Sequence, residues 1–182
     1  MANVVFTMAV SADGFFEGPD REIGWHRVDE ELHQHFNDWL GQVDGFIHGR
    51  RTYELMAAYW PTADTDPGAS PVEKQFAGIW RDMPKIVYSR TLAEVGWGST
   101  LRREVVPEEV RAAEGTFTIG GAELADEFIR HGLITEYRVY VHPVAIGAGR
   151  PMFRRPVDLE LLDTQRFGNG VVMLRYAPGD AK

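Results

Sequence analysis

The sequence predicts an α/β fold in which a mixed sheet carries helices on its faces. Through roughly the first two thirds of the chain, short apolar runs alternate with segments of helical periodicity, which is typical of parallel β-α-β units. After residue 135, three strand-like runs follow one another with no helix between them, which indicates antiparallel strands added to the same sheet. Between the last two runs, Asn169-Gly170 is a strong two-residue hairpin signal.

Segments rich in apolar, β-branched or aromatic residues predict the strands of the sheet. The runs have the length of strands, and turn-forming residues bound most of them. We expect strands at Val4–Val10, Val43–His48, Pro84–Tyr88, Thr116–Ile119, Glu136–Val144, Leu159–Phe167 and Val171–Tyr176.

Helix-start signals and helical periodicity mark the segments between these strands. Asp29 is suited to cap a helix whose Leu32, Phe36, Trp39 and Leu40 form one apolar stripe. The proline-rich stretch 61–71 predicts a long surface loop. Further helices are expected at Thr52–Ala58, after Pro71, at Pro107–Ala113 and at Ala122–His131.

The composition is that of a globular protein. Its 182 residues are 44% hydrophobic and 25% charged, so we expect a single domain over residues 1–182. The sequence has no cysteine, which excludes disulfides, thiolate metal sites and thiol nucleophiles. Met1–Val10 lacks a basic leader, and no apolar run reaches the ~20 residues that span a bilayer. We therefore expect a cytoplasmic protein with no membrane partner.

The charge of the protein bears on which kinds of ligand or partner it can bind. The formal net charge is −8, from 19 basic and 27 acidic residues, so nucleic acid would be repelled unless positive charges cluster. We therefore expect no nucleic-acid partner. Sixteen of the basic residues are arginines and three are lysines. Because the guanidinium fork suits phosphate, the positions of the arginines matter.

Gly49-Arg50-Arg51-Thr52 directly follows a predicted strand, at the kind of junction where open α/β sheets bind ligands. Two arginines at a helix N-terminus oppose the helix dipole, at a cost of roughly 0.3–1 kcal/mol each when they are exposed. Guanidinium groups, free backbone N–H groups and the Thr52 hydroxyl together suit a phosphate. The alternative is that both arginines point into solvent and that Thr52 is a cap.

Gly120-Gly121 is a second unusual junction, between a predicted strand and a predicted helix. Paired glycines let the backbone approach a pyrophosphate closely at a helix N-terminus. The alternative is a tight turn that requires positive φ. The chain has no Gly-x-Gly-x-x-Gly fingerprint, since Pro151 rather than a helix follows Gly147-Ala148-Gly149.

Ser89-Arg90 is the third junction, at the end of the strand predicted over Pro84–Tyr88. A hydroxyl and a guanidinium at a strand end suit a phosphate monoester such as the 2′-phosphate of NADP. The alternative is a turn serine followed by a surface arginine. The occurrence of all three junctions in one chain is more informative than any one of them.

Other chemistries have less support. There is no Gly-x-Ser-x-Gly elbow and no Walker loop. His33 and His35 are two residues apart on a predicted helix and face different directions, so no metal site is predicted. The acidic helix start Asp29-Glu30-Glu31 is explained by the helix dipole, but it would also supply a carboxylate for proton donation or substrate anchoring.

Taken together, these residues resemble the dihydrofolate reductase-like superfamily, and most of all its bacterial branch related to the C-terminal reductase domain of riboflavin biosynthesis. The resemblance covers most of the chain, and its motifs agree in order and spacing. They are Ser11-Ala-Asp-Gly-Phe15, Gly49-Arg-Arg-Thr-Tyr-Glu54, Ile86-Val-Tyr-Ser-Arg90, Ile119-Gly-Gly-Ala-Glu-Leu124, Glu136-Tyr-Arg-Val-Tyr-Val-His-Pro143 and Ile146-Gly-Ala-Gly-Arg-Pro-Met-Phe153.

The resemblance implies a three-layer fold with a mainly parallel sheet and antiparallel C-terminal strands, and NADPH bound across the strand ends. The Gly49 motif would hold the pyrophosphate and the side of the 2′-phosphate, and the Gly-Gly turn would lie under the pyrophosphate. Ser89 and Arg90 would lie at the adenosine-phosphate end. Ala9 would lie by the nicotinamide. The implied cofactor-binding residues are Ala9, Gly49, Arg50, Arg51, Thr52, Ser89, Arg90, Ile119, Gly120, Gly121, Ala122 and Leu124.

The resemblance also implies a proton-donating acid on the helix after the first loop. Glu30 or Glu31 falls nearest to that position, and Asp13 lies in the loop expected beside the nicotinamide. The sequence departs from the family pattern at Ala122, which replaces a third glycine, and at His48, which replaces an apolar residue. The implied substrate is a pterin, a pyrimidine or another flat heterocycle.

The leading hypothesis is therefore an NADPH-dependent oxidoreductase that transfers hydride to a small heterocycle. A non-catalytic nucleotide-binding module is the first alternative, and a flavin-binding protein is the second. We also expect a homodimer, because the C-terminal antiparallel strands offer a sheet edge with apolar residues.

Overall fold

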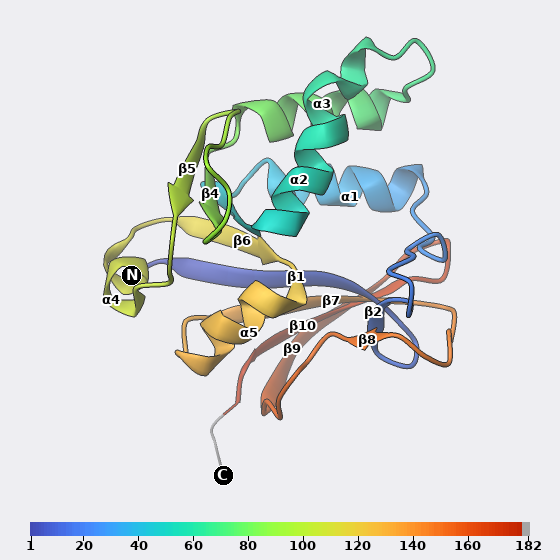
Figure 1. Cartoon of the computed structure of the whole chain (residues 1–182). Helices are drawn as coiled ribbons and strands as arrows, with labels where there is room; N and C mark the ends of the chain where they lie inside the picture. Colours follow the sequence, from blue (N-terminus) through green and yellow to red (C-terminus); the bar gives the residue numbers. More distant parts are fainter. Residues whose placement is uncertain (180–182) are drawn as a thin grey trace.

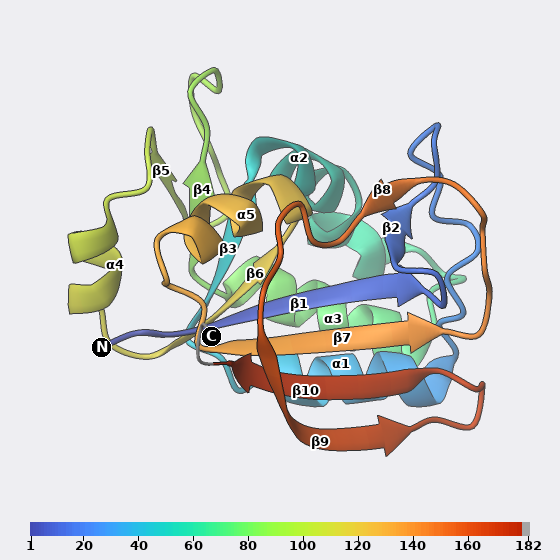
Figure 2. The same ribbon diagram turned by 90° about the horizontal axis from the view of Figure 1, so that it is seen from below.

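The structure, a computed structural model that describes residues 1–179, is built on one eight-stranded sheet. The strands are β1 (Asn3–Ser11), β3 (Gly45–Gly49), β4 (Lys85–Tyr88), β5 (Ser99–Arg102), β6 (Thr116–Gly120), β7 (Glu136–His142), β9 (Leu159–Arg166) and β10 (Val172–Pro178). Their order across the sheet is β5-β4-β3-β6-β1-β7-β10-β9 (Figures 1 and 2).

The sheet is mixed, as the sequence predicts, but the change of direction comes later than expected. Strand β7 pairs parallel with β1, with Val10 opposite Val141, so the expectation that all the late strands are antiparallel is wrong for β7. A helix between β6 and β7 carries the chain back along the sheet, which makes this crossover parallel. Only β10 on β7, and β9 on β10, pair antiparallel in this sheet.

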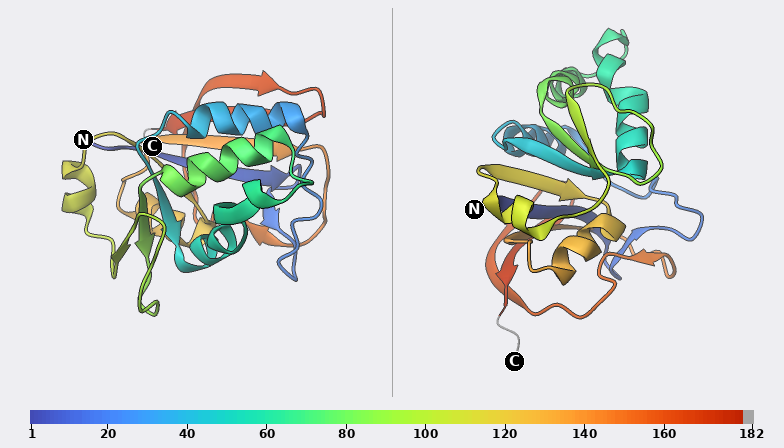
Figure 3. Two further views of the ribbon diagram at one scale, coloured as in Figure 1. Left: turned by 90° about the horizontal axis from the view of Figure 1, so that it is seen from above. Right: turned by 60° about the vertical axis from the view of Figure 1, so that its left-hand side comes forward.

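Helices cover both faces of the sheet, which confirms the predicted three-layer fold (Figure 3). On one face lie α1 (Glu30–Leu40), α2 (Arg50–Tyr59) and α3 (Pro71–Asp82), and on the other lies α5 (Ala122–Arg130). Side chains of β1 alternate between the layer of α5 and the layer of α1. Phe6 packs in the same buried cluster as Phe128 of α5, whereas Ala9 packs against the cluster that contains Leu32 of α1. The short helix α4 (Pro107–Ala112) lies at the end of the sheet near the N-terminus.

The expected surface loop over residues 61–71 is partly wrong. A 3-10 helix, η1 (Trp60–Thr65), begins with Pro61 at its first turn and buries Pro61 and Ala63. Arg81 of α3 fixes it by donating to the Pro61 carbonyl at 2.9 Å and to both oxygens of Asp64. Proline at the start of a helical turn is favourable, and the buried contacts with α3 decide the conformation.

The predicted hairpin between β9 and β10 is present, with a longer turn than the two-residue signal indicates. Residues 167–171 separate the two strands. Gly170 has φ of 88°, and the Asn169 side chain accepts the Val171 N–H at 3.0 Å. The Phe167 N–H also donates to the Val171 carbonyl at 2.9 Å, which closes the wider turn.

Strand β5 and a small second sheet are elements that the sequence reasoning missed. Strand β5 is a polar edge strand, so it has no apolar run to mark it. The second sheet pairs β2 (Phe15–Glu17) with β8 (Arg150–Pro151), which are too short for a periodic signal. Gly149 allows this pairing, because a Cβ there would lie 2.3 Å from the Glu17 carbonyl oxygen.

Candidate active site

The three junctions that the sequence singles out lie side by side at the carboxyl ends of β3, β4 and β6. Gly49 at the end of β3 is opposite Tyr88 of β4, the residue before Ser89. His48 is opposite Gly120 of β6. Because these strands are parallel, their ends and the segments that leave them share one edge of the sheet.

The N-termini of α2 and α5 approach each other closely at this edge. Gly121 has φ of 94°, and a Cβ on it would lie 2.9 Å from the Thr52 hydroxyl oxygen. A Cβ on Gly49 would lie 3.7 Å from the Leu124 Cβ. The positive φ of Gly121 confirms the tight turn, and the absence of a side chain also lets two helix starts come together.

These two helix starts lack side-chain caps, unlike the starts of α1 and α3. Asp29 accepts the Leu32 N–H at 3.0 Å to cap α1, and Ser70 with Glu73 forms a capping box on α3. Within residues 1–179, no side chain caps α2 or α5. Their first-turn N–H groups therefore remain available, and the dipoles of both helices favour an anion between them.

Two cavities open along this edge and share part of their lining, and we refer to the two together as the groove. The first, of about 320 Å³, is lined by the starts of α2 and α5 and by the second sheet. The second, of about 550 Å³, extends to the ends of β4 and β5. Both are lined by Gly49, Arg50, Glu123 and Leu124, so Arg50 lies where the two halves meet.

The first cavity is positively charged although the protein is acidic. Its lining holds four arginines and two glutamates, a net charge of +2 in a chain of net charge −8. Arg150 pairs with Glu17 at 3.0 Å and also with Glu123. Arg51 lies 3.6 Å from the same Glu17 carboxylate. Glu17 is buried and thus holds two guanidinium groups at the cavity wall.

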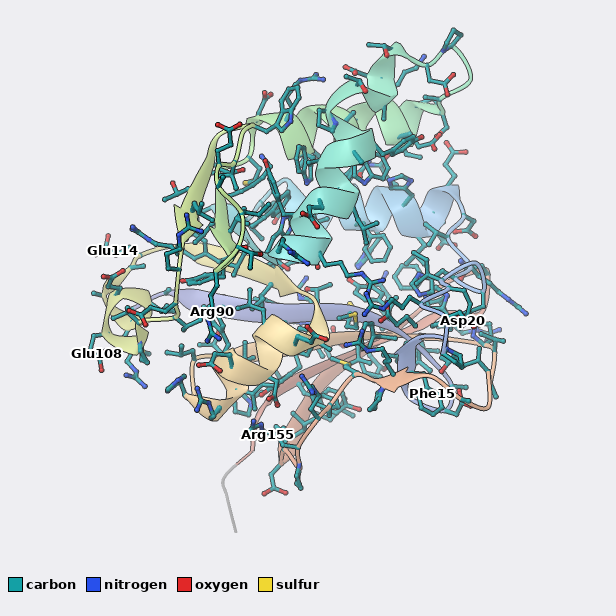
Figure 4. All side chains as sticks on the ribbon, viewed as in Figure 1. Phe15, Asp20, Arg90, Glu108, Glu114 and Arg155 are labelled. Atoms are coloured by element: carbon teal, nitrogen blue, oxygen red, sulfur yellow. The ribbon has the colours of Figure 1, made fainter. Side chains whose placement is uncertain are left out.

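At the second cavity, the turn after β4 is held by Ser89. Its hydroxyl accepts the N–H groups of Thr91 at 3.2 Å and Leu92 at 3.0 Å, which leaves the O–H hydrogen free to donate. Arg103 donates to the Ser89 carbonyl at 3.0 Å and lines the cavity beside Arg90. Figure 4 shows Arg90 between the end of β4 and α5, with Phe15 and Asp20 on the other side of the molecule.

The structure brings most of the expected cofactor-binding residues to the groove. The first cavity is lined by the residues of both helix starts, and the second is lined by Ser89 and Arg90. Ile119 and Ala9 line neither cavity: Ile119 is fully buried in the core, and Ala9 packs against the cluster beside α1. The residues along the groove are Gly49, Arg50, Arg51, Thr52, Ser89, Arg90, Gly120, Gly121, Ala122 and Leu124.

The three candidate acids lie elsewhere. Glu30 and Glu31 are exposed at the start of α1, and Glu31 accepts the Gly168 N–H at 2.9 Å. Asp13 accepts the N–H groups of Ile146 at 3.2 Å and Gly147 at 2.8 Å. Hydrogen bonds from Ser11 and from the Gly147 backbone hold the pKa of Asp13 below its usual value, so this carboxylate stays charged as an anchor between two loops.

Several groove residues were missed by the sequence reasoning. Glu17 and Arg21 belong to the segment around β2. Leu55 follows the Gly49 motif, and Arg103 directly follows the unpredicted strand β5. Arg150 stands inside the quoted Gly-Ala-Gly-Arg motif, but its side chain was given no role. Two features of the sequence could have pointed to these residues: the basic pair Arg102-Arg103 and the arginine after Gly149.

In residues 1–179 there is no helix with the length and apolar character needed to cross a membrane. Over the same residues, no three His, Cys, Asp or Glu side chains gather in a way that would hold a metal ion.

Comparisons with known proteins agree with this architecture. A family model described as the RibD C-terminal domain matches residues 2–116 and 111–173. The protein YyaP of Bacillus subtilis (strain 168) is 32% identical over 181 residues, which cover 95% of this chain and 93% of YyaP.

Two solved structures share the fold. A putative riboflavin biosynthesis protein from Shewanella sp. PV-4 is similar with a TM-score of 0.71 and 21% identity, covering 99% of this chain and 100% of its own. Dihydrofolate reductase from Enterococcus faecalis, complexed with NADP(H), gives a TM-score of 0.64 at 14% identity and covers 98% of this chain and 97% of its own. The predicted resemblance to the riboflavin-biosynthesis reductase branch is confirmed by the family model, and the fold is shared with a dihydrofolate reductase. The chain belongs to the RibD C-terminal domain family.

Proposed function

We propose that the protein is an NADPH-dependent oxidoreductase that reduces a small heterocyclic substrate, of the pterin or pyrimidine kind, by hydride transfer. The observation that carries the proposal is the meeting of two uncapped helix starts with Arg50 and Arg51 in one positively charged cavity. Two free helix ends and two guanidinium groups fit a pyrophosphate.

The groove has room and chemistry for the rest of a dinucleotide. Arg90 and Arg103 line the second cavity, where they would bind the 2′-phosphate of an adenosine. The hydroxyl of Ser89 would donate to the same phosphate, because its accepted hydrogen bonds hold it in the turn. Arg50, at the junction of the two cavities, would lie between the two phosphate groups.

When bound, NADPH supplies the hydride, and the chain supplies orientation and electrostatics. In the first cavity, Glu17 orients the guanidinium groups of Arg51 and Arg150, which would fix the anionic part of the ligand. Phe16 lines the same cavity and presents an apolar ring to a flat ligand. Glu30, Glu31 and Asp13 stay our candidates for the acid, and their role requires that the bound substrate reaches the segment beside α1.

A second candidate function is a nucleotide-binding module without turnover. It is favoured by the position of Glu30, Glu31 and Asp13, none of which lines either cavity in the described part of the chain. This candidate predicts that NADPH binds but that no reducible heterocycle is consumed. A single substrate with turnover would dismiss it.

The decisive experiment is a titration with NADPH that uses energy transfer from the five tryptophans to the nicotinamide. We expect saturable binding in the micromolar range or tighter, and the same protein should then be screened with pterins and pyrimidines under NADPH consumption. No saturable binding would refute the oxidoreductase and the nucleotide-binding module together.

We also propose that the protein is a homodimer that pairs through β9. Seven of the eight residues of this edge strand are exposed, with Leu161 at 55% and Leu162 at 51% exposure. Leu162 is the extra residue at a register shift between Leu161, opposite Tyr176, and Asp163, opposite Arg175, so two adjacent apolar side chains are exposed on this edge.

A further inference from the structure

A cluster of three rings lies outside the groove, where the loop between β2 and α1 meets the end of β7. Trp25 and His26 belong to this loop, and His142 ends β7. The ring centroids of Trp25 and His26 are 4.3 Å apart, those of His26 and His142 are 5.1 Å apart, and those of Trp25 and His142 are 5.9 Å apart. His142 is 0% exposed.

The hydrogen bond to His142 fixes which of its ring nitrogens carries the proton. The Nδ1 atom of His142 accepts the Arg27 N–H at 2.9 Å, so the neutral ring carries its proton on Nε2. The Phe16 backbone beside the His26 ring raises the pKa of this histidine, although burial has the larger and opposite effect. With the proton of the neutral ring on Nδ1, the Nε2 atom of His26 would be an acceptor with a free lone pair. Burial lowers the pKa of both rings, which keeps both of them neutral near pH 7.

Each of the three side chains therefore has one unused polar atom. Trp25 Nε1, His26 Nε2 and His142 Nε2 are all buried, and none has a hydrogen-bond partner within residues 1–179. Two of these atoms are donors and one is an acceptor. Buried polar groups are nearly always hydrogen-bonded, so each of these atoms requires a partner that the surrounding groups of the described residues do not supply.

We propose that Trp25, His26 and His142 form a binding site for one water molecule. A water oxygen accepts two hydrogen bonds, here from Trp25 Nε1 and His142 Nε2, and one of its hydrogens is donated to His26 Nε2. Buried waters in proteins typically make about three hydrogen bonds, which is the number offered here.

The water site joins the loop to the sheet. The same loop is held from the other side by Asn169, whose amide donates to the Arg27 carbonyl at 2.9 Å. This loop carries Arg21, which lines the first cavity. Phe16, whose backbone lies beside the His26 ring, lines the same cavity. The water thus fixes the position of one wall of the groove, and this role goes beyond the proposed function.

The direct test is water-to-protein magnetisation transfer in the ligand-free protein, observed at the tryptophan indole and histidine Nε2–H protons by NMR. We expect cross-peaks between water and both the Trp25 indole N–H and the His142 Nε2–H. The Trp25→Phe variant identifies the indole signal, and the exposed Trp97 provides the matched substitution Trp97→Phe. A dry cluster, in which both protons are shielded from water and give no cross-peak, would overturn the proposal.

A second measurement separates the water from the packing of the rings. His142→Gln places an amide nitrogen near the Nε2 position and keeps a donor for the water, whereas His142→Asn keeps an acceptor for Arg27 and loses that donor. We expect the cross-peak at the Trp25 indole to persist in H142Q and to disappear in H142N. Persistence in both variants would show that His142 does not bind the water.

The link between the water and the loop is tested by hydrogen exchange of backbone amides between residues 18 and 29. Loss of one hydrogen bond to the water in Trp25→Phe should speed exchange there about fivefold, while Trp97→Phe leaves it unchanged. Equal amide exchange rates in the two variants would show that the water does not stabilise this loop. Neither readout requires that NADPH binds, so the outcome is independent of the proposed reductase.

Discussion

Glu17 and Arg150 form an ion pair of 3.0 Å that joins β2 to β8 at the wall of the first cavity. The Glu17 side chain is 9% exposed, and it also lies 3.6 Å from Arg51. Because removing one partner leaves a poorly solvated charge, Glu17→Gln should lower the free energy of unfolding by about 2–3 kcal/mol. Thermal denaturation checks this.

The matched control is Glu54→Gln. Glu54 pairs with Arg50 at 3.8 Å, but both side chains are about half exposed. Exposed pairs contribute little, so this variant should change the free energy of unfolding by less than about 0.5 kcal/mol. Equal destabilisation by the two variants would contradict the role given to Glu17.

Gly121→Ala should destabilise the protein, because a Cβ at this position would lie 2.9 Å from the Thr52 hydroxyl and φ is 94°. The backbone conformation alone costs about 1–2 kcal/mol for alanine. Gly120→Ala is the neighbouring control, since a Cβ there meets no atom within 4 Å. Urea denaturation of the two variants should give a clearly lower midpoint for G121A only.

Arg90→Ala should weaken NADPH about tenfold or more while leaving NADH within about twofold, since a charge-assisted hydrogen bond to the 2′-phosphate is lost. Arg166→Ala removes an exposed arginine from β9, away from the groove, and should change neither affinity. Fluorescence titrations with both nucleotides measure the four constants. Equal losses for NADPH and NADH would exclude Arg90 as the reader of the 2′-phosphate.

Stability should fall as the pH drops from about 6.5 to about 4. Burial lowers the pKa of His48 and of His142 from 6.5 to about 4, so in this range the unfolded chain binds protons that the folded protein does not. Each contributes a loss of up to about 3 kcal/mol, at about 1.4 kcal/mol per pH unit of pKa difference. Chemical denaturation at several pH values measures the slope.

His142→Gln should flatten the slope between pH 6.5 and 4 and leave it unchanged above pH 7. The carboxylates affect the free energy of unfolding at lower pH than these histidines do. Hydrogen bonds from Arg155 hold the pKa of Asp126 below 3.8, so the stability that it contributes is lost only as the pH falls through that lower value. An unchanged slope in H142Q would show that this histidine is not the titrating group.

Leu162→Asp should convert the dimer to a monomer if β9 is the interface, because a carboxylate would replace an exposed apolar side chain at the edge. Ile23→Asp is the control, as Ile23 is 53% exposed on a different segment. Light scattering at micromolar concentration gives the mass. A monomeric wild-type protein would refute the dimer itself.

Local pattern was sufficient to predict most of the fold. Strands such as Val43–His48 and Thr116–Ile119 are marked by apolar runs, and the Asp29 cap accepts its helix N–H as expected. Strand β5 was missed because a polar edge strand gains its stability from pairing with β4, which a local pattern does not report. The 3-10 helix after Trp60 was missed because the packing of Pro61 and Ala63 against α3 decides it.

The parts of the candidate site that lie in short local motifs, with an arginine or a glycine at a helix start, could be predicted from the sequence. The parts that depend on contacts between distant segments could not. Arg50 and Gly121 were found because an arginine at a helix start and a paired glycine are locally unfavourable. Glu17 and Arg150 are 133 positions apart, and only the pairing of β2 with β8 brings them together. No spacing rule reports such a contact.

The open starts of α2 and α5 have a consequence for the stability of the whole protein. An anion that closes both helix ends binds the folded chain and not the unfolded one, so it raises the free energy of unfolding in proportion to the logarithm of its concentration above the dissociation constant. Plain inorganic phosphate or sulfate should therefore protect the protein against heat. The melting temperature is set partly by the buffer in which it is measured.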